Sequence, residues 1–103
     1  MIDFSQYLKE IRMSSGLTQT QFAAKLNIDT AALSKIENGK KDFDPQKLEI
    51  LSKEFKIDFN ELKKSYFGEK IAIELYSHCC PMETLRVAEK KFKYLAQKEH
   101  CHE

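Results

Sequence analysis

Cysteine, proline and glycine are scarce in this chain of 103 residues, which has three cysteines, two prolines and three glycines. The cysteines are odd in number and lie at positions 79, 80 and 101. This placement argues against a framework of intrachain disulfides and is typical of reduced cytosolic thiols. The low glycine and proline content disfavours a long β-sandwich and favours a helix-rich chain.

Long apolar runs are also absent. No stretch approaches about 18 apolar residues, and the N-terminal sequence MIDFSQYLKE lacks the basic and apolar regions of a signal peptide. We therefore expect a cytoplasmic protein with no membrane partner. The chain has room for one domain and a small appendage, which excludes large enzyme folds. Its formal net charge is only +1, so any affinity for nucleic acid must come from local placement of charges.

Five short helices are predicted between residues 3 and 67. Each is expected to begin where a side chain can accept hydrogen bonds from backbone amides, and apolar residues follow at intervals of three and four. These N-cap positions are Asp3, Thr18, Asp29, Asp44 and Asp58. Asn27 suits a left-handed turn after the second helix, and Gly68 is predicted to end the fifth.

Two further helical segments are predicted in the last third of the chain. The first contains Ile71 and Tyr76, the second runs from Met82 through Leu95, and Pro81 separates them. The expected architecture is thus all-α, with a domain over residues 1–66 and a C-terminal helical hairpin over residues 67–103.

The second and third helices form a helix-turn-helix pattern, which holds one polar helix face in the major groove of DNA. From Ile11 onward the sequence, IR…GLTQTQFAAKLNIDTAALSKIENGK, resembles the phage-repressor/Cro-like (XRE-like) helix-turn-helix family, and the similarity continues to about Tyr66. The resemblance implies a five-helix domain that binds double-stranded DNA, typically as a dimer that represses or regulates transcription.

The same resemblance implies which residues meet DNA. Base edges would be contacted by the exposed front of the third helix, at Thr30, Ala31, Ser34 and Lys35. Phosphates would be contacted by Thr18, Gln19, Asn38 and Lys40. Threonine, serine and lysine side chains can bind base edges, but this face has no arginine, glutamine or asparagine before Asn38 that could bind a base with two hydrogen bonds. The alternative is a solvated helix face without a ligand.

Two other sets of residues are given structural roles. Arg12 and Glu37 match a family ion pair that ties the third helix to the first. A structural role is preferred to DNA contact for both, because a glutamate facing phosphates would weaken DNA binding. In the last helix an apolar seam is predicted to form a dimer, or instead to close on residues 71–76 of its own chain. The seam residues are Leu85, Ala88, Phe92 and Leu95. The competing function is an antitoxin or interaction module whose hairpin binds a partner protein.

The remaining candidates are two clusters, His78-Cys79-Cys80 and His100-Cys101-His102, whose residue types would suit zinc. A helix between them would separate the clusters by roughly 25–30 Å within one chain, so no metal site is predicted. Free thiols are preferred, with metal binding or redox sensing as alternatives. No catalytic constellation or phosphate-binding glycine loop is present in the sequence, so we predict neither an enzyme nor a cofactor.

Overall fold

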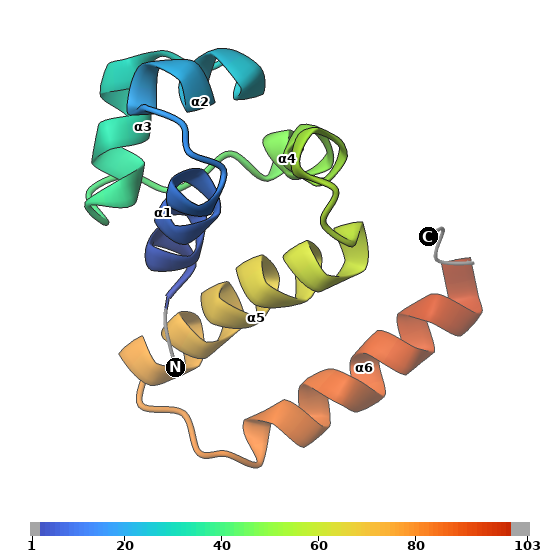
Figure 1. Cartoon of the computed structure of the whole chain (residues 1–103). Coiled ribbons are helices and arrows are strands. Elements are labelled where there is room, and N and C mark those ends of the chain that lie inside the picture. Colours follow the sequence, from blue (N-terminus) through green and yellow to red (C-terminus); the bar gives the residue numbers. More distant parts are fainter. Residues whose placement is uncertain (1–2, 100–103) are drawn as a thin grey trace. The chain divides into compact units, whose positions relative to one another are not determined.

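A computed structural model describes residues 3–99, and every regular element in this range is helical (Figure 1). The helices are α1 (Phe4–Ser14), α2 (Gln19–Leu26), α3 (Thr30–Glu37), α4 (Leu48–Phe55), α5 (Phe59–Ser77) and α6 (Thr84–Glu99). A short 3₁₀ turn, η1 (Pro45–Lys47), precedes α4. The all-α prediction is confirmed.

The chain divides into two compact units, an N-terminal unit over Met1–Lys70 and a C-terminal unit over Ile71–Glu103. The N-terminal unit contains α1 to α4 and the first part of α5. The C-terminal unit contains the end of α5 and α6. This division lies within α5, four residues beyond residue 66.

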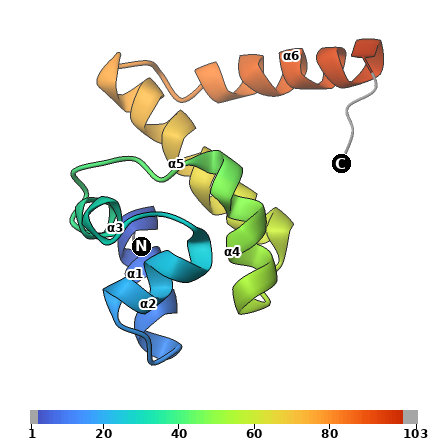
Figure 2. The same ribbon diagram turned by 90° about the horizontal axis from the view of Figure 1, so that it is seen from above.

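The core of the N-terminal unit is built from the apolar faces of its helices. Figure 2 shows α1, α2 and α3 grouped together, with α4 beside α2. Phe22, Leu33 and Leu51 have no exposed surface, and each comes from a different helix. Phe4, Phe43 and Tyr66 form an aromatic cluster in which the rings of Phe4 and Tyr66 lie edge to face, 5.2 Å between centroids. Burial of such side chains stabilises the fold by about 1.5–3 kcal/mol each.

Side-chain caps begin the first helices as the sequence predicts. The Asp3 carboxylate accepts from the amide of Gln6 at 2.9 Å. Thr18 and Gln21 form a complete capping box, with hydrogen bonds of 3.1 and 2.9 Å. Asp29 accepts from the amide of Ala32 at 2.6 Å. These bonds satisfy amides that a helix cannot satisfy itself, and so fix where α1, α2 and α3 begin.

The predicted end of the fifth helix at Gly68 is wrong. α5 passes through Gly68 and ends at Ser77, so the segment containing Ile71 and Tyr76 is its last part and not a separate helix. A glycine within a helix costs only about 1 kcal/mol, and neighbouring contacts offset this cost. The Glu69 carboxylate accepts from the amide of Phe4 at 2.7 Å, and Lys70 pairs with Asp42 at 2.8 Å.

The start of the fourth helix also differs from the prediction. Asp44 does accept from the amide of Gln46 at 2.9 Å, but Pro45 opens the 3₁₀ turn η1, and α4 begins at Leu48. α4 ends at Phe55 and is followed by the C-cap residue Lys56, whose φ of 55° is left-handed. Lysine is not a residue that marks this conformation in a sequence, so the position of the C-cap was not predictable.

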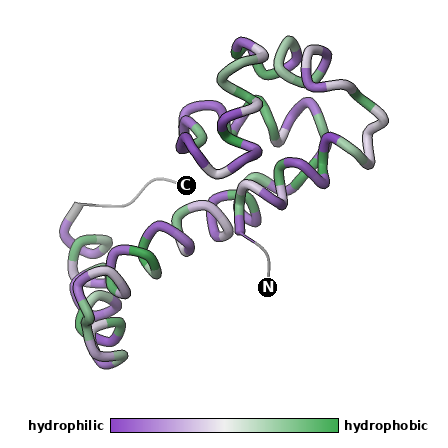
Figure 3. The backbone as a smooth tube through the Cα atoms, turned by 90° about the vertical axis from the view of Figure 1, so that its left-hand side faces the viewer, coloured by the Kyte–Doolittle hydropathy of each residue, from purple (hydrophilic) through white to green (hydrophobic). Residues whose placement is uncertain are grey.

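Within the C-terminal unit, a tight turn follows α5. Cys79 has a φ of 54°, and the amides of Cys79 and Cys80 donate to the carbonyls of Tyr76 and Leu75 at 3.0 and 2.9 Å. This pair of bonds is a Schellman motif, which ends a helix and is usually built on glycine. Both hydrophobic and hydrophilic residues occur in α6 (Figure 3), and its large apolar side chains are exposed.

Candidate nucleic-acid interface

The α2–turn–α3 segment is held rigidly against the core. Ala23 is almost fully buried where α2 meets α3, and its carbonyl accepts from the amide of Ile28 at 3.0 Å. Asn27 adopts the left-handed conformation, with a φ of 58°, that the sequence predicts for the turn. Three residues, 27–29, connect the two helices. The orientation of α3 is therefore fixed by packing on one side and by hydrogen bonds at the turn.

The two faces of α3 differ sharply. Leu33 and Ile36 are buried in the core, whereas Ala31 and Lys35 are exposed. Thr30 and Ser34, on the same outward side, are partly exposed, and the Thr30 hydroxyl donates to that of Thr20 at 3.4 Å. The four predicted base-contacting residues thus lie together on the surface of a fixed helix. Such a face can present hydroxyl, methyl and ammonium groups to a groove.

Behind this face, Arg12 and Glu37 form a two-point ion pair. Nε of Arg12 lies 2.7 Å from Oε2 of Glu37, and Nη2 lies 3.1 Å from Oε1. The Glu37 side chain is only 2% exposed and that of Arg12 is 14% exposed. Arg12 also donates to the carbonyl of Leu17 at 3.0 Å. The pair connects α1, the α1–α2 turn and the C-terminal end of α3.

Gln19 joins the same cluster, which the sequence did not predict. Its amide Nε2 donates to Oε1 of Glu37 at 3.0 Å. Gln19 was predicted to contact a phosphate, and Thr18, the other residue at the start of α2, is exposed. A glutamine amide has two N–H donors, so one remains for another acceptor while the first is bound to Glu37.

The C-terminal end of α3 is closed by Gly39 and Lys40. Gly39 has a φ of 74°, and the amide of Lys40 donates to the carbonyl of Lys35 at 2.8 Å. Asn38 and Lys40, the other predicted phosphate-binding residues, are exposed here together with Lys41. Among the described residues, no carboxylate pairs with Lys35, Lys40 or Lys41. These three cations are therefore available to an anionic ligand.

The loop after α3 is attached to α5 by contacts that the sequence did not predict. The Tyr66 hydroxyl donates to the carbonyl of Phe43, and the Lys70 ammonium pairs with Asp42. The hydrogen bond with Asp42 is the main reason that the pKa of Lys70 lies above its ordinary value of 10.5. These residues lie 23 and 28 positions apart in the sequence, and no local pattern indicates such pairs.

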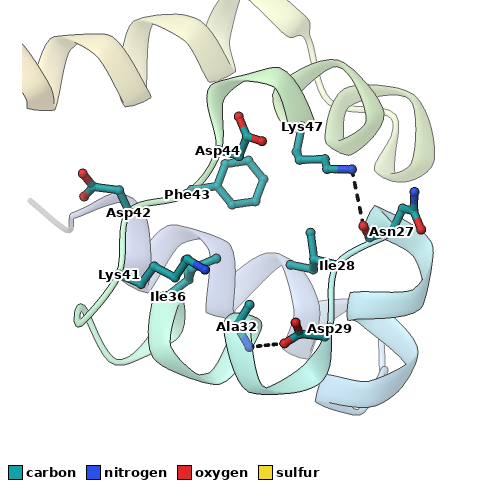
Figure 4. A pocket seen from close by; sticks show the side chains of 10 residues that line it. All are labelled: Asn27, Ile28, Asp29, Ala32, Ile36, Lys41, Asp42, Phe43, Asp44 and Lys47. Atoms are coloured by element: carbon teal, nitrogen blue, oxygen red, sulfur yellow. Dashed lines mark hydrogen bonds between the residues drawn. The ribbon is translucent and has the colours of Figure 1, made fainter.

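A hollow of about 390 Å³ lies between the α2–α3 turn and the loop after α3 (Figure 4). The Lys47 ammonium crosses its edge and donates to the carbonyl of Asn27 at 3.3 Å. The other charged residues that line it are Lys41, Asp29, Asp42 and Asp44. The positive charges of two lysines are balanced by the negative charges of three aspartates, so this hollow has no excess of positive charge that would attract a phosphate.

The cysteine clusters are only partly placed. Cys79 and Cys80 are exposed free thiols in the turn after α5, and His78 lies 3.4 Å from the Glu74 carboxylate. His100, Cys101 and His102 lie outside the described residues. Within residues 3–99, no three potential metal ligands converge. In this same range no helix combines the length and apolarity needed to cross a membrane.

Comparison with known proteins agrees with this geometry. The sequence profile of a helix-turn-helix family matches residues 8–62, from α1 to the first part of α5. The chain is 34% identical over 61 residues to the HTH-type transcriptional activator BcrR of Enterococcus faecalis. That alignment covers 59% of this chain but only 30% of the relative, and no solved structure is significantly similar. Because the profile spans more than half of the chain and coincides with the α2–turn–α3 geometry, the chain belongs to the helix-turn-helix family.

Proposed function

We propose that the protein is a DNA-binding transcription regulator that inserts α3 into the major groove of double-stranded DNA. The observation that carries this proposal is the fixed orientation of α3, whose apolar face is buried while its polar face is exposed. In helix-turn-helix proteins this arrangement presents a helix to base edges. The family membership and the relative, which is named as a transcriptional activator, support the proposal.

In this proposal Thr30, Ala31, Ser34 and Lys35 contact base edges. The hydroxyls donate or accept, the Ala31 methyl packs on a thymine methyl, and Lys35 binds guanine N7 or O6. None of these side chains forms the two-point contacts that arginine or asparagine makes with a single base. Direct recognition is therefore sparse, and sequence-dependent DNA shape supplies part of the specificity.

The phosphate contacts in this proposal come from the two ends of the motif. Thr18 and Gln19 lie at the start of α2, where amides and the helix dipole favour an anion. Asn38 and Lys40 lie in the turn that ends α3. Residues 1–66 contain 11 basic and 10 acidic residues, so attraction to phosphates is local and modest.

We further propose that the regulator acts as a homodimer formed by α6, with one α3 at each half-site. The seam of α6 is exposed and available to a second copy. Two copies related by a two-fold axis match the symmetry of a DNA site with two half-sites about 34 Å apart. Repression is the expected outcome when such a site overlaps a promoter, and a reporter assay with and without the protein measures the direction of regulation.

Selection from a random library of DNA duplexes, followed by footprinting, tests the proposal. The wild-type protein should enrich a defined sequence at moderate salt. Ser34→Glu on α3 should abolish the enrichment, since its carboxylate would face the DNA. Ser65→Glu is the matched control, because Ser65 is exposed on α5, and it should leave the selection unchanged. Failure of the wild type to enrich any sequence would contradict the proposal.

The exposed apolar surface of the C-terminal unit also favours a second candidate, a module that binds a different protein through this surface, as an antitoxin does. In the first candidate a second copy of the chain covers α6, and in the second candidate a different protein covers it. Sedimentation equilibrium of the full-length protein at micromolar concentration separates them. A dimer supports the regulator described above, and a monomer favours capture of another protein.

A further inference from the structure

The apolar seam of α6 forms a stripe along the helix, and all four of its side chains are exposed. Leu85, Phe92 and Leu95 are 41%, 63% and 53% exposed, and Ala88, between them, is exposed as well. Surfaces of this kind on a short amphipathic helix are usually covered by a second helix. The spacing and the sizes of the four side chains indicate how a second copy of α6 would cover this stripe.

The stripe is symmetric about position 90, because its residues are separated by three, four and three positions. An antiparallel copy of α6 therefore places Leu85 opposite Leu95 of the second copy, and Ala88 opposite Phe92 of the second copy. A parallel copy places each residue opposite its own equivalent. The small Ala88 then meets another alanine, and Phe92 meets another phenylalanine. Only the antiparallel pairing combines a small with a large side chain in the central layers.

The charges beside the stripe favour the parallel orientation, but their contribution is smaller than that of side-chain packing. Antiparallel pairing brings Lys91 near Lys91 of the second copy, and Glu89 near Glu89 of the second copy. However, Glu89 is already paired with Lys93 of its own helix at 3.3 Å, and both residues of that pair are solvent-exposed. Exposed charge pairs contribute little to stability, whereas a gap or an overpacked layer in an apolar interface costs several times more. Packing therefore decides the orientation.

We propose that two copies of the chain pair through α6 in the antiparallel orientation, with Ala88 of each packed against Phe92 of the other around a two-fold axis near Lys90. This inference rests on the dimer in the proposed function and specifies its geometry. Binding of both copies to one DNA site strengthens this pairing further.

Chemical cross-linking tests the orientation without removing a seam residue. In a full-length background with Cys79→Ser, Cys80→Ser and Cys101→Ser, Lys91→Cys places one thiol beside the two-fold axis in the antiparallel pair. A bismaleimide that spans about 10 Å, the separation of packed helix axes, should then link two copies. Lys90→Cys is the matched control, because its thiol points away from the seam.

The expected result is that Lys91→Cys forms covalent dimers at least about tenfold faster than Lys90→Cys at equal concentration. Circular dichroism establishes that both variants retain their helices. Parallel pairing would instead link Lys91→Cys with Ala96→Cys in a mixture, and that result would overturn the proposal. Equal rates for Lys91→Cys and Lys90→Cys, or a monomer by sedimentation, would also overturn it. The cross-linking contains no DNA, so its outcome is independent of whether the DNA-binding proposal holds.

Discussion

In the N-terminal unit Leu8, Leu33 and Leu51 have no exposed surface, whereas in the C-terminal unit Leu85, Phe92 and Leu95 are each at least two-fifths exposed. The first unit completes its core with its own helices and leaves a polar face on α3 for a ligand. The second unit leaves its apolar side chains on the surface. The difference is consistent with the proposed separation of tasks, in which the first unit recognises DNA and the second associates with another chain.

Removal of the C-terminal unit should have the largest effect on DNA binding. Truncation after Lys70 retains the contacts of Glu69 with Phe4 and of Lys70 with Asp42, which truncation at Tyr66 would remove. The truncated protein should stay folded but monomeric. Its affinity for a two-half-site DNA should fall by roughly 10²–10⁴-fold, because the second half-site contact is no longer intramolecular. Fluorescence anisotropy measures this loss, and an unchanged affinity would show that α6 does not assemble the DNA-binding dimer.

The ion pair behind α3 should give the largest effect on folding. Arg12→Met leaves the Glu37 carboxylate buried with Gln19 as its remaining side-chain partner, and should lower the free energy of unfolding by up to about 3–5 kcal/mol. Adding Glu37→Leu should restore much of this loss, because apolar side chains can replace a buried pair. Urea denaturation of the wild type, the two single variants Arg12→Met and Glu37→Leu, and the double variant provides a double-mutant cycle. Additive effects would contradict a close interaction between Arg12 and Glu37.

Replacing one leucine by alanine in each unit should reveal how differently the two units depend on their apolar side chains. Leu51→Ala opens a cavity in the core and should destabilise the N-terminal unit by about 2–5 kcal/mol. Leu95→Ala, on the exposed seam, should change unfolding of a monomeric sample by no more than about 0.5 kcal/mol. Thermal denaturation at low protein concentration measures both. A large loss for Leu95→Ala under these conditions would mean that its own chain covers the seam.

The smallest effect is expected at the surface pair of Lys70 and Asp42. The Lys70 side chain is 41% exposed, so Lys70→Met should cost no more than about 1 kcal/mol. Because the pKa of Lys70 is raised, this contribution is complete below 10.5 and is lost only as the pH rises through the folded-state pKa. The difference between wild type and variant should stay constant from about pH 6 to 9. A difference that changes within this range would assign the effect to another group.

Local features of the sequence predicted most of the N-terminal unit. Thr18, Asn27 and Asp29 set the ends of α2 and α3 through hydrogen bonds within a few residues, and such bonds follow from residue type and spacing. The prediction that the fifth helix ends at Gly68 was wrong. The helix continues because Tyr66, Glu69 and Lys70 on either side of Gly68 bind Phe43, Phe4 and Asp42, which are distant in the sequence. Tertiary contacts override the weak preference of a single glycine to end a helix.

The candidate site was predictable to a similar extent. The exposed and buried faces of α3 follow from its apolar spacing, so the positions of Ala31 and Lys35 could be inferred. The bond from Gln19 to Glu37 could not, since it depends on how the start of α2 meets the end of α3. Helix orientation is set by packing between elements, which residue spacing alone does not determine.

Recognition of base edges by the outer face of α3 is tested by affinity measurements on all single-base variants of the selected DNA site. Wild type, Lys35→Ala and Lys40→Ala are compared. Lys35→Ala should lose about 1–3 kcal/mol on the preferred site and no longer discriminate at one position. Lys40→Ala should weaken every site equally and lower the salt dependence by about one unit. Identical behaviour of the two variants would contradict the claim.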